Sequence, residues 1–201
     1  MNVPAIAKKT FEKFRSSIEC DTIFKFILSH LQQTPDKSQR ARFVHDVVDK
    51  FNVEVFAHPL VKKFSPCKSG CTGCCHTQVS VTSDEAHLLA QRVKEGVSID
   101  LELLKLQMKA GDSSELFKEL PYAQRRCVFL SESGTCKIYE DRPSVCRTNA
   151  VLGEASQCDT SVTEQPLVLV ITKNADIAIY SSFVHSKENG SLPHLLGKLL
   201  L

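Results

Sequence analysis

The chain is organised around residues 67–76, which read Cys67-Lys-Ser-Gly-Cys71-Thr-Gly-Cys74-Cys75-His76. Three residues separate the first two cysteines and two separate the second from the third, with a glycine before each of the latter two. Ligands at such short spacing can be directed at one point by a single backbone turn, and glycine permits the tight conformations that this turn needs. Thiolate sulfur is a soft donor that binds zinc or iron–sulfur clusters better than magnesium or calcium. The stretch therefore indicates a metal centre.

Four further cysteines follow at looser spacing, and with them the predicted ligands number eight. The adjacent Cys74 and Cys75 would point to opposite faces of an extended backbone, so the pair does not readily serve one tetrahedral ion. Eight thiols can form two four-cysteine sites, one polynuclear site, or one site with additional structural cysteines, and the spacing does not choose among these. The predicted cofactor is zinc or iron, the latter with an iron–sulfur cluster as one form. The predicted metal ligands are Cys67, Cys71, Cys74, Cys75, Cys127, Cys136, Cys146 and Cys158.

The composition favours metal ligation over a disulfide framework. Nine cysteines is an odd number, and 201 residues are enough to bury a core without disulfide support. The N-terminus carries Lys8 and Lys9 but lacks the apolar stretch of a secretory signal. We therefore expect a cytoplasmic protein, in a compartment that keeps thiols reduced, with disulfides as the alternative.

Charge and hydropathy argue against two kinds of partner. The 25 basic and 23 acidic residues leave a net charge of +2 without a basic stripe, so no nucleic-acid partner is predicted. The longest apolar run, residues 167–171, is far shorter than the roughly 20 residues that a membrane-spanning helix needs. No membrane span is expected, and the sequence names no protein partner.

Residues 1–66 are predicted to form an N-terminal helical segment. Apolar side chains recur at the α-helical period within residues 20–31 and again within residues 44–55, and residues 33–36 break the pattern. This predicts two helices joined by a turn. Cys20 lies on the first apolar stripe, far from the other cysteines in sequence, so it is interpreted as a core residue.

Helix signals resume after the first cysteine block. Thr82 and Glu85 form a capping-box pair at the start of one predicted helix, which makes capping the expected role of Glu85. Ser98 is expected to cap a second helix, and Asp112 or Ser113 to start a short third helix.

The remaining regular structure is predicted to be two hairpins and a tail helix. Residues 127–130 and 136–139 are apolar runs separated by a turn, and residues 167–172 and 177–180 repeat this arrangement. Residues 192–201 are apolar enough to dock as a helix. The expected fold class is α+β, mainly helical, with small β-hairpins beside a cysteine-bound metal centre.

The predicted organisation has three segments. Residues 1–66 form the N-terminal helical segment and residues 67–166 the cysteine-cluster metal-binding region. Residues 167–201 form a C-terminal hairpin and tail helix that pack on the same domain.

Three side chains beside the cysteines have two interpretations each. His76 could ligate or shield the centre, or be a partly exposed loop histidine. Arg142 and Arg147 flank Cys146 in a predicted helical turn opened by a proline. They could donate hydrogen bonds to thiolates, or pair with the neighbouring acidic residues 140 and 141.

The cysteine blocks resemble a known family. Cys67-Lys-Ser-Gly-Cys71-Thr-Gly-Cys74-Cys75, followed by the block from Cys127 to Arg147 with its Cys136-x-Ile-Tyr-x2-Arg-Pro-x2-Cys146 pattern, is similar to the YkgJ-type cysteine-cluster (CxxCxxCC) proteins. The resemblance covers roughly residues 67–158 and implies zinc or iron chelation through the eight cysteines.

The functional role of the centre stays open at this stage. The predicted function is the binding of zinc or an iron–sulfur centre through the eight cysteines, with the role of the centre undetermined, and the alternative is a metal- or cluster-dependent enzyme of the redox or protein-methylation type. A flagellin lysine methylase carries a similar cysteine signature, which is the basis of the methylation alternative. The first block also matches the spacing of radical S-adenosylmethionine enzymes, but the alternating strand–helix units of those enzymes are absent from the sequence.

Overall fold

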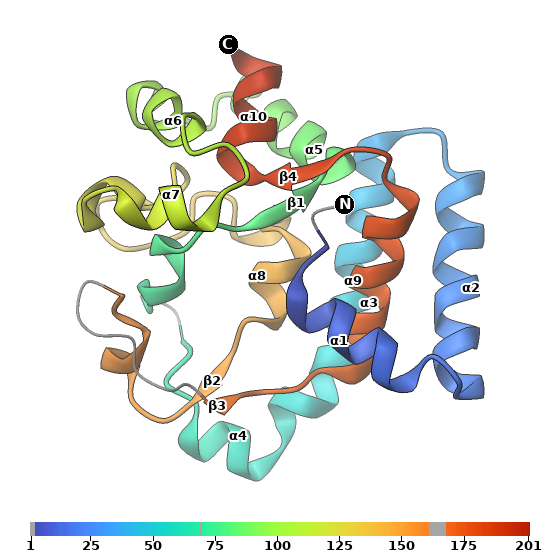
Figure 1. The fold of residues 1–201 in the computed structure, drawn as a ribbon. Helices are drawn as coiled ribbons and strands as arrows, with labels where there is room; N and C mark the ends of the chain where they lie inside the picture. Colours follow the sequence, from blue (N-terminus) through green and yellow to red (C-terminus); the bar gives the residue numbers. More distant parts are fainter. Residues whose placement is uncertain (1–2, 69, 161–167) are drawn as a thin grey trace.

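The computed structural model describes residues 3–68, 70–160 and 168–201. Its helices are α1 (Ala5–Phe14), α2 (Ile18–Gln33), α3 (Lys37–Ala57), α4 (Pro59–Phe64), α5 (Ser83–Lys94), α6 (Leu101–Met108), α7 (Ser114–Glu119), α8 (Ser144–Thr148), α9 (Lys173–His185) and α10 (Leu192–Leu200) (Figure 1). Its strands are β1 (Ser80–Thr82), β2 (Val151–Leu152), β3 (Val168–Leu169) and β4 (Asn189–Ser191).

Helices dominate, and the strands form two short antiparallel pairs. One pair joins β1 to β4 and the other joins β2 to β3. The expected mainly helical α+β fold is confirmed. Within the described ranges no helix is both long and apolar enough to cross a membrane.

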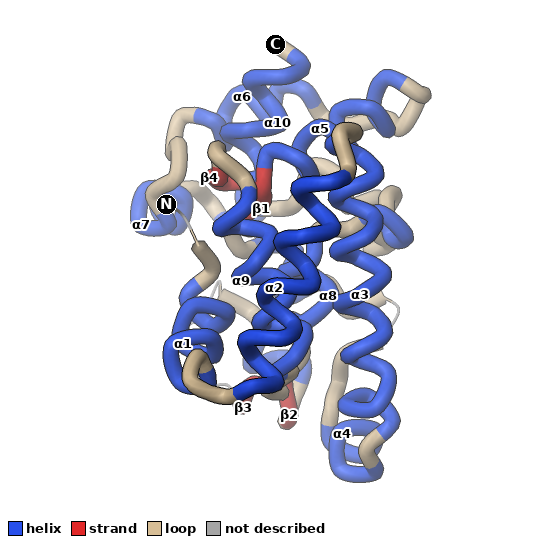
Figure 2. The backbone as a smooth tube through the Cα atoms, turned by 90° about the vertical axis from the view of Figure 1, so that its right-hand side faces the viewer, coloured by secondary structure: helices blue, strands red, loops and turns tan. Residues whose placement is uncertain are grey.

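One part of the molecule, here called the helical half, consists of α1, α2, α3 and α9. The long helices α2 and α3 flank α9, which also packs against α1 (Figure 2). The core between them is apolar and contains fully buried Ile27, Val48, Ala178 and Phe183. Both helices predicted within residues 1–66 are present, and Cys20 is fully buried in α2.

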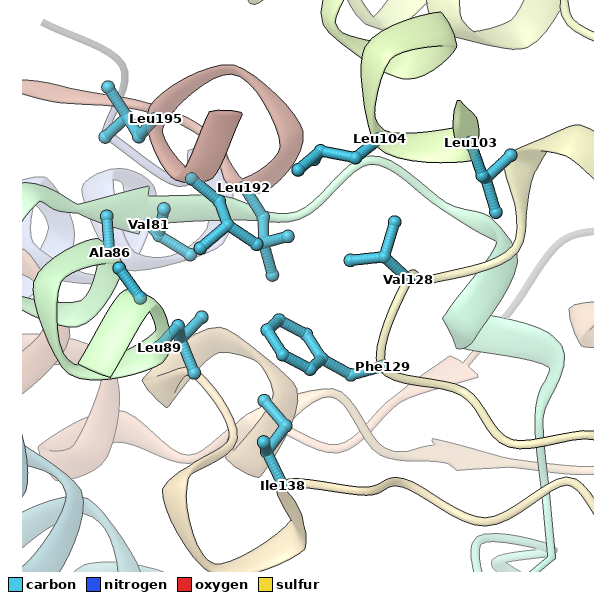
Figure 3. Packing of buried hydrophobic residues seen from close by; sticks show 12 residues of the cluster. Val81, Ala86, Leu89, Leu103, Leu104, Val128, Phe129, Ile138, Leu192 and Leu195 are labelled. Atoms are coloured by element: carbon cyan, nitrogen blue, oxygen red, sulfur yellow. The ribbon is translucent and has the colours of Figure 1, made fainter. Parts of the chain in front are cut away.

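A second core lies between α5, α6, α10 and the loop that carries residues 127–138. Figure 3 shows Phe129 and Val128 of this loop meeting Leu89 of α5, Leu104 of α6 and Leu192 of α10. The predicted tail helix is therefore present as α10, and its apolar face covers the loop that holds two of the predicted ligands.

The helix caps predicted from the sequence are present, with one exception. The Thr82–Glu85 capping box is formed at the start of α5, and Ser113 accepts a hydrogen bond from Leu116 N at the start of α7. The prediction that Ser98 caps α6 is wrong, because Asp100 Oδ1 accepts from Leu103 N at 2.9 Å. Residues 97 and 99 pack against the second core, so the chain stays extended for two residues longer than expected.

The second predicted hairpin is wrong. Residues 177–180 belong to α9, and β3 pairs with residues 151–152 instead. A short apolar run does not distinguish a strand from a buried helix, and α9 is buried on most sides in the helical half. Leu167, at the start of the predicted first arm, lies outside the described residues.

The first predicted hairpin forms only in part. The single bridge Leu130↔Cys136 and the turn that closes with Gly134 N donating to Ser131 O are present, but no named strand extends from them. This bridge places Cys136 at the base of the turn, on the arm that faces the arm of Cys127.

Candidate metal centre

The eight predicted ligands lie on short elements and loops between longer helices. The first four follow α4, with Cys74 and Cys75 in a 3-10 turn, η1 (Gly73–His76). Cys127 and Cys136 occupy the partial hairpin, Cys146 lies in α8, and Cys158 ends another 3-10 turn, η4 (Ala155–Cys158). The three elements that present Cys74, Cys75, Cys146 and Cys158 are therefore only four or five residues long.

A cavity of about 670 Å³ brings most of these thiols together. Its walls include residues from both cysteine blocks, although the blocks are some 50 residues apart in sequence. Among the described lining residues there is no aspartate or glutamate. The cysteines that line it are Cys67, Cys71, Cys74, Cys75, Cys127, Cys136 and Cys146.

Cys158 does not line the cavity but lies against the turn that does. A Cβ atom at Gly73 would be only 2.5 Å from Cys158 Cβ, so this close approach of η1 and η4 requires glycine. Burial, and then the charges of Cys71 and Cys67, raise the pKa of Cys158. Cys158 is therefore a neighbour of the first block.

The first and second blocks are also tied by backbone. Cys127 N donates a 2.7 Å hydrogen bond to Cys75 O, and Cys75 N donates to Thr72 O at 2.9 Å. Gly70 has a φ of +86°, a conformation that glycine adopts without strain. The turn between Cys67 and Cys75 is therefore strongly bent, and both adjacent cysteines reach the same cavity.

The thiols share a cavity without forming a closed coordination sphere. Within residues 3–68, 70–160 and 168–201, no three or more Cys, His, Asp or Glu side chains are grouped closely enough to hold one metal ion. The cysteines must therefore move toward one another for several of them to ligate the same ion.

The environment of the thiols favours their protonated form unless a cation is present. Burial raises the pKa of Cys127 to about 11 and raises that of Cys136 as well. Burial and the nearby Cys127 and Cys74 raise the pKa of Cys146 well above its ordinary value. A hydrogen bond with Cys75, and burial, raise the pKa of Cys74. The mutual repulsion of these sulfurs is what a bound cation would relieve.

His76 is not among the described residues that line the cavity. Its Nδ1 is 3.2 Å from Thr72 O, and its ring stacks on Tyr122 at 4.3 Å between centroids. The stack packs η1 against the neighbouring 3-10 turn η2 (Tyr122–Arg125). His76 therefore supports the turn that carries Cys74 and Cys75.

The two arginines that flank Cys146 have different environments. Arg147 is buried, forms an ion pair with Asp49 of α3, and donates to the carbonyl oxygens of Glu140 and Arg142. Arg142 is half-buried and lies over the Tyr139 ring, with Cζ 3.9 Å from the centroid. Neither arginine pairs with the side chains of residues 140 or 141 among the described contacts.

Glu85 has a larger role than the capping that the sequence indicated. It is 2% exposed, and its Oε1 accepts from Ser144 N at 2.7 Å, from Ser144 Oγ, and contacts His45 Nε2 at 3.2 Å. Burial raises the pKa of this carboxyl, but hydrogen bonds with His45 and Ser144 outweigh it and lower the pKa to about 2. One carboxylate thus joins α3, α5 and the start of α8, the helix that presents Cys146.

No spacing rule identifies this contact. Glu85 lies 40 residues from His45 and 59 from Ser144 in sequence. The capping box accounts for Glu85 Oε2, which accepts a hydrogen bond from Thr82 N. Oε1 accepts from Ser144 N, and this contact depends on how α8 packs.

The donor set fits a metal that prefers sulfur, since seven thiols and no carboxylate line the cavity. The family model CxxCxxCC, described as "Putative zinc- or iron-chelating domain", matches residues 66–166, half of the chain. The chain belongs to this family of cysteine-cluster domains. Comparison with curated proteins and with solved structures found no match.

Proposed function

We propose that the protein binds zinc or iron through the eight cysteines and that metal chelation is its primary biochemical function. The observation that carries the proposal is the cavity into which both cysteine blocks bring their thiols. Cys158, which lies against Gly73 of the first cysteine block, is the proposed eighth ligand. The family description agrees with zinc or iron as the metal.

Binding requires movement and proton release. No group of three close ligands exists among the described residues, so the thiols must come closer together around the ion, by rotation of the side chains or by movement of the loops. The raised pKa values of Cys127, Cys136 and Cys146 mean that ligation displaces protons from these thiols. Apparent metal affinity therefore rises with pH, and part of the binding free energy is used to order the loops.

The test is elemental analysis of protein purified without air, together with its absorption spectrum. Zinc with no visible colour identifies a zinc protein, whereas iron with acid-labile sulfide and a visible band identifies an iron–sulfur protein. We expect at least about one metal equivalent per chain. The proposal fails if well-folded protein contains almost no metal and takes up none when zinc or ferrous iron is added.

A pair of cysteine variants provides the control. Cys127→Ala removes a thiol that lines the cavity, and we expect it to lose half or more of the metal. Cys20→Ala removes a thiol buried in α2 and should retain the wild-type metal content. Equal loss in both variants would show that metal content follows stability rather than ligation.

A metal- or cluster-dependent enzyme is the second candidate. The observation in its favour is the size of the cavity, because 670 Å³ lies within the range of small-molecule sites and exceeds the volume that a single ion needs. A catalytic centre keeps a coordination position open. Cyanide or azide binding to the metal-loaded protein, seen as a spectral change, would support this candidate, and full four-cysteine saturation would exclude it.

A further inference from the structure

The cavity beside the cysteines contains more than thiols. Its volume of about 670 Å³ is typical of sites that enclose most of a small organic molecule. The lining includes apolar side chains from α3, α4 and α8, among them Phe56, Val61 and Val145. Leu130 and Ile138 of the partial hairpin extend this apolar lining.

All the charged side chains among the described lining residues are cationic. Four cationic side chains contribute to the lining, Lys62, Lys68, Arg142 and Arg147, and no aspartate or glutamate does. Arg147 is neutralised by Asp49. In the part of the chain that the structure describes, no ion pair is formed by Lys62, Lys68 or Arg142, so these three cations keep their charge available to a ligand.

Arg142 is held in place before any ligand arrives. Its guanidinium lies over the Tyr139 ring, and its Nη1 donates to Tyr139 O at 3.0 Å. One edge of a planar guanidinium can form two parallel hydrogen bonds with a carboxylate or a phosphate. The stacking leaves the remaining guanidinium donors without a protein acceptor among the described residues, while the group stays half-buried at the cavity wall.

We propose that the cavity binds a small organic anion, a carboxylate or phosphate ester with an apolar body, and that Arg142, with Lys62 and Lys68, recognises its charged group. The position of this ligand beside a metal rests on the proposed function, whereas the anion site itself rests on the cavity and its cations. The apolar body would contact Phe56, Val61 and Val145. Lys62 lies on α4, Lys68 in the loop that follows it, and Arg142 just before α8, so the ligand would contact segments that are far apart in sequence.

A simpler role for the cations would be to offset the negative charge of thiolate-bound metal. Arg142 acts in that direction on Cys136, since its charge opposes the burial that raises the pKa of this thiol. Variants in which these cationic side chains are replaced distinguish the two roles. Charge compensation predicts loss of metal, whereas ligand recognition predicts loss of anion binding with the metal retained.

The experiment measures binding of benzoate and phenyl phosphate to metal-loaded protein by isothermal titration calorimetry, with benzamide as a neutral probe of similar shape. We expect at least one of the anions to bind about tenfold or more tightly than benzamide, because hydrogen bonds to a charged group account for such a difference. Arg142→Gln should weaken anion binding by about tenfold, and the double variant Lys62→Gln/Lys68→Gln by severalfold. Metal content is measured for every variant.

Lys63→Gln is the matched control. Lys63 is next to Lys62 on α4, lies over the Phe64 ring and is not among the cavity-lining residues, so its removal should leave anion binding unchanged. If Arg142→Gln does not fold, the Lys62→Gln/Lys68→Gln variant decides the question, because both of its side chains are exposed.

Three results would overturn the inference. Benzamide could bind as tightly as both anions, the cation variants could bind anions like the wild type, or they could lose metal in proportion to anion binding. A chain that takes up no metal but still binds anions with the expected pattern among the variants would support the anion site and reject the proposed function. The failures of the two proposals are therefore distinguishable.

Discussion

The helical half and the region that holds the cysteines differ in the source of their order. The helical half has helices of up to 21 residues that bury Ile27, Val48 and Phe183 against one another. Apart from β1 and α5 to α7, the described residues between α4 and β2 form loops, 3-10 turns and the five-residue α8, and their thiols line the cavity. Apolar burial accounts for the order of the helical half. In the second region it orders the loop that carries Cys127 and Cys136, whereas the turn from Cys71 to Cys75 is not part of that core.

The cysteine loops are therefore held in place by their contacts with the surrounding helices. Phe129 anchors the partial hairpin in the second core, and Glu85 anchors the start of α8. Cys127 and Cys136 also pack against the second core, whereas among the described residues no contact of this kind orders the thiols of the first cysteine block. A metal ion that joins them would supply the missing free energy, as it does in small metal domains.

The largest expected effect comes from removing the metal. Chelation should lower amide protection strongly in residues 70–79 and 127–158, because structural zinc sites contribute on the order of 10 kcal/mol or more at neutral pH. Protection in α2, α3 and α9 should persist. Hydrogen exchange read by mass spectrometry before and after chelation measures this, and equal protection of the cysteine loops in both forms would erase the distinction between the two regions.

Truncation of Phe183 tests the independence of the helical half. Phe183→Ala should destabilise the protein by about 3 to 5 kcal/mol, because the side chain is fully buried between α9 and its neighbours. The metal content of the folded protein should stay at the wild-type level, while Phe129→Ala should reduce both stability and metal content. Urea denaturation and elemental analysis measure the two quantities, and loss of metal in folded Phe183→Ala protein would contradict the separation.

Glu85 joins the two regions, so its replacement should affect both. Glu85→Gln should cost about 3 kcal/mol at pH 7, since the buried carboxylate contacts His45 and Ser144. The folded pKa of about 2 lies below the ordinary value of 4.5, so this contribution is present above pH 4.5 and is lost as the pH falls toward 2.

The measurement is denaturant unfolding of wild type and Glu85→Gln between pH 3 and 7. The difference between the two should shrink as the pH falls, and the variant should also bind metal more weakly if Cys146 is a ligand. Glu95→Gln, an exposed change at the other end of α5, is the control and should stay within about 0.5 kcal/mol of the wild type. A pH-independent difference would show that Glu85 acts through packing and not through its charge.

The smallest effect is expected at Asp176, inside the helical half. Its carboxyl is 3% exposed and accepts hydrogen bonds from Thr10 and Thr172, and burial raises its pKa from 3.8 to about 6. A raised carboxyl pKa contributes stability below pH 3.8 that is lost as the pH rises through 6. Asp176→Asn should therefore stabilise the protein by about 2 to 3 kcal/mol at pH 8 and by almost nothing at pH 4.

Thermal melts of Asp176→Asn at both pH values measure this effect. Metal content should not change, because Asp176 belongs to the interface of α1 and α9. Asp21→Asn on the exposed face of α2 is the control, with no expected pH dependence of this size. If the variant is less stable than the wild type at pH 8, the ionised carboxylate of Asp176 stabilises the folded protein, which contradicts the prediction.

The sequence predicted those features that depend on local periodicity or on short-range hydrogen bonds. The apolar stripe through Cys20 and the capping box at Thr82 are of this kind, and the structure has both. The run at residues 177–180 was misassigned because burial on most sides of α9 removes the amphipathic pattern that identifies a helix. The contact of Glu85 with Ser144 could not be predicted, since it depends on how α8 packs.

The sequence predicted which residues belong to the candidate site but not how they are arranged in space. The cysteine spacing indicated ligands that converge, and seven of the eight line one cavity. The cations around it were not assigned to a common surface, because Lys62, Lys68 and Arg142 lie on separate elements that only the fold brings together. The number of metal centres depends on how far the thiols move, which no spacing specifies.

X-ray absorption spectroscopy at the edge of the metal found in the purified protein tests the central claim most directly. Cysteine ligation predicts a first shell dominated by sulfur, at about 2.3 Å for zinc. Cys127→Ala should reduce that sulfur shell or remove the metal, and Cys20→Ala should leave the spectrum unchanged. A first shell of oxygen and nitrogen with no sulfur would contradict the assignment of these cysteines as ligands.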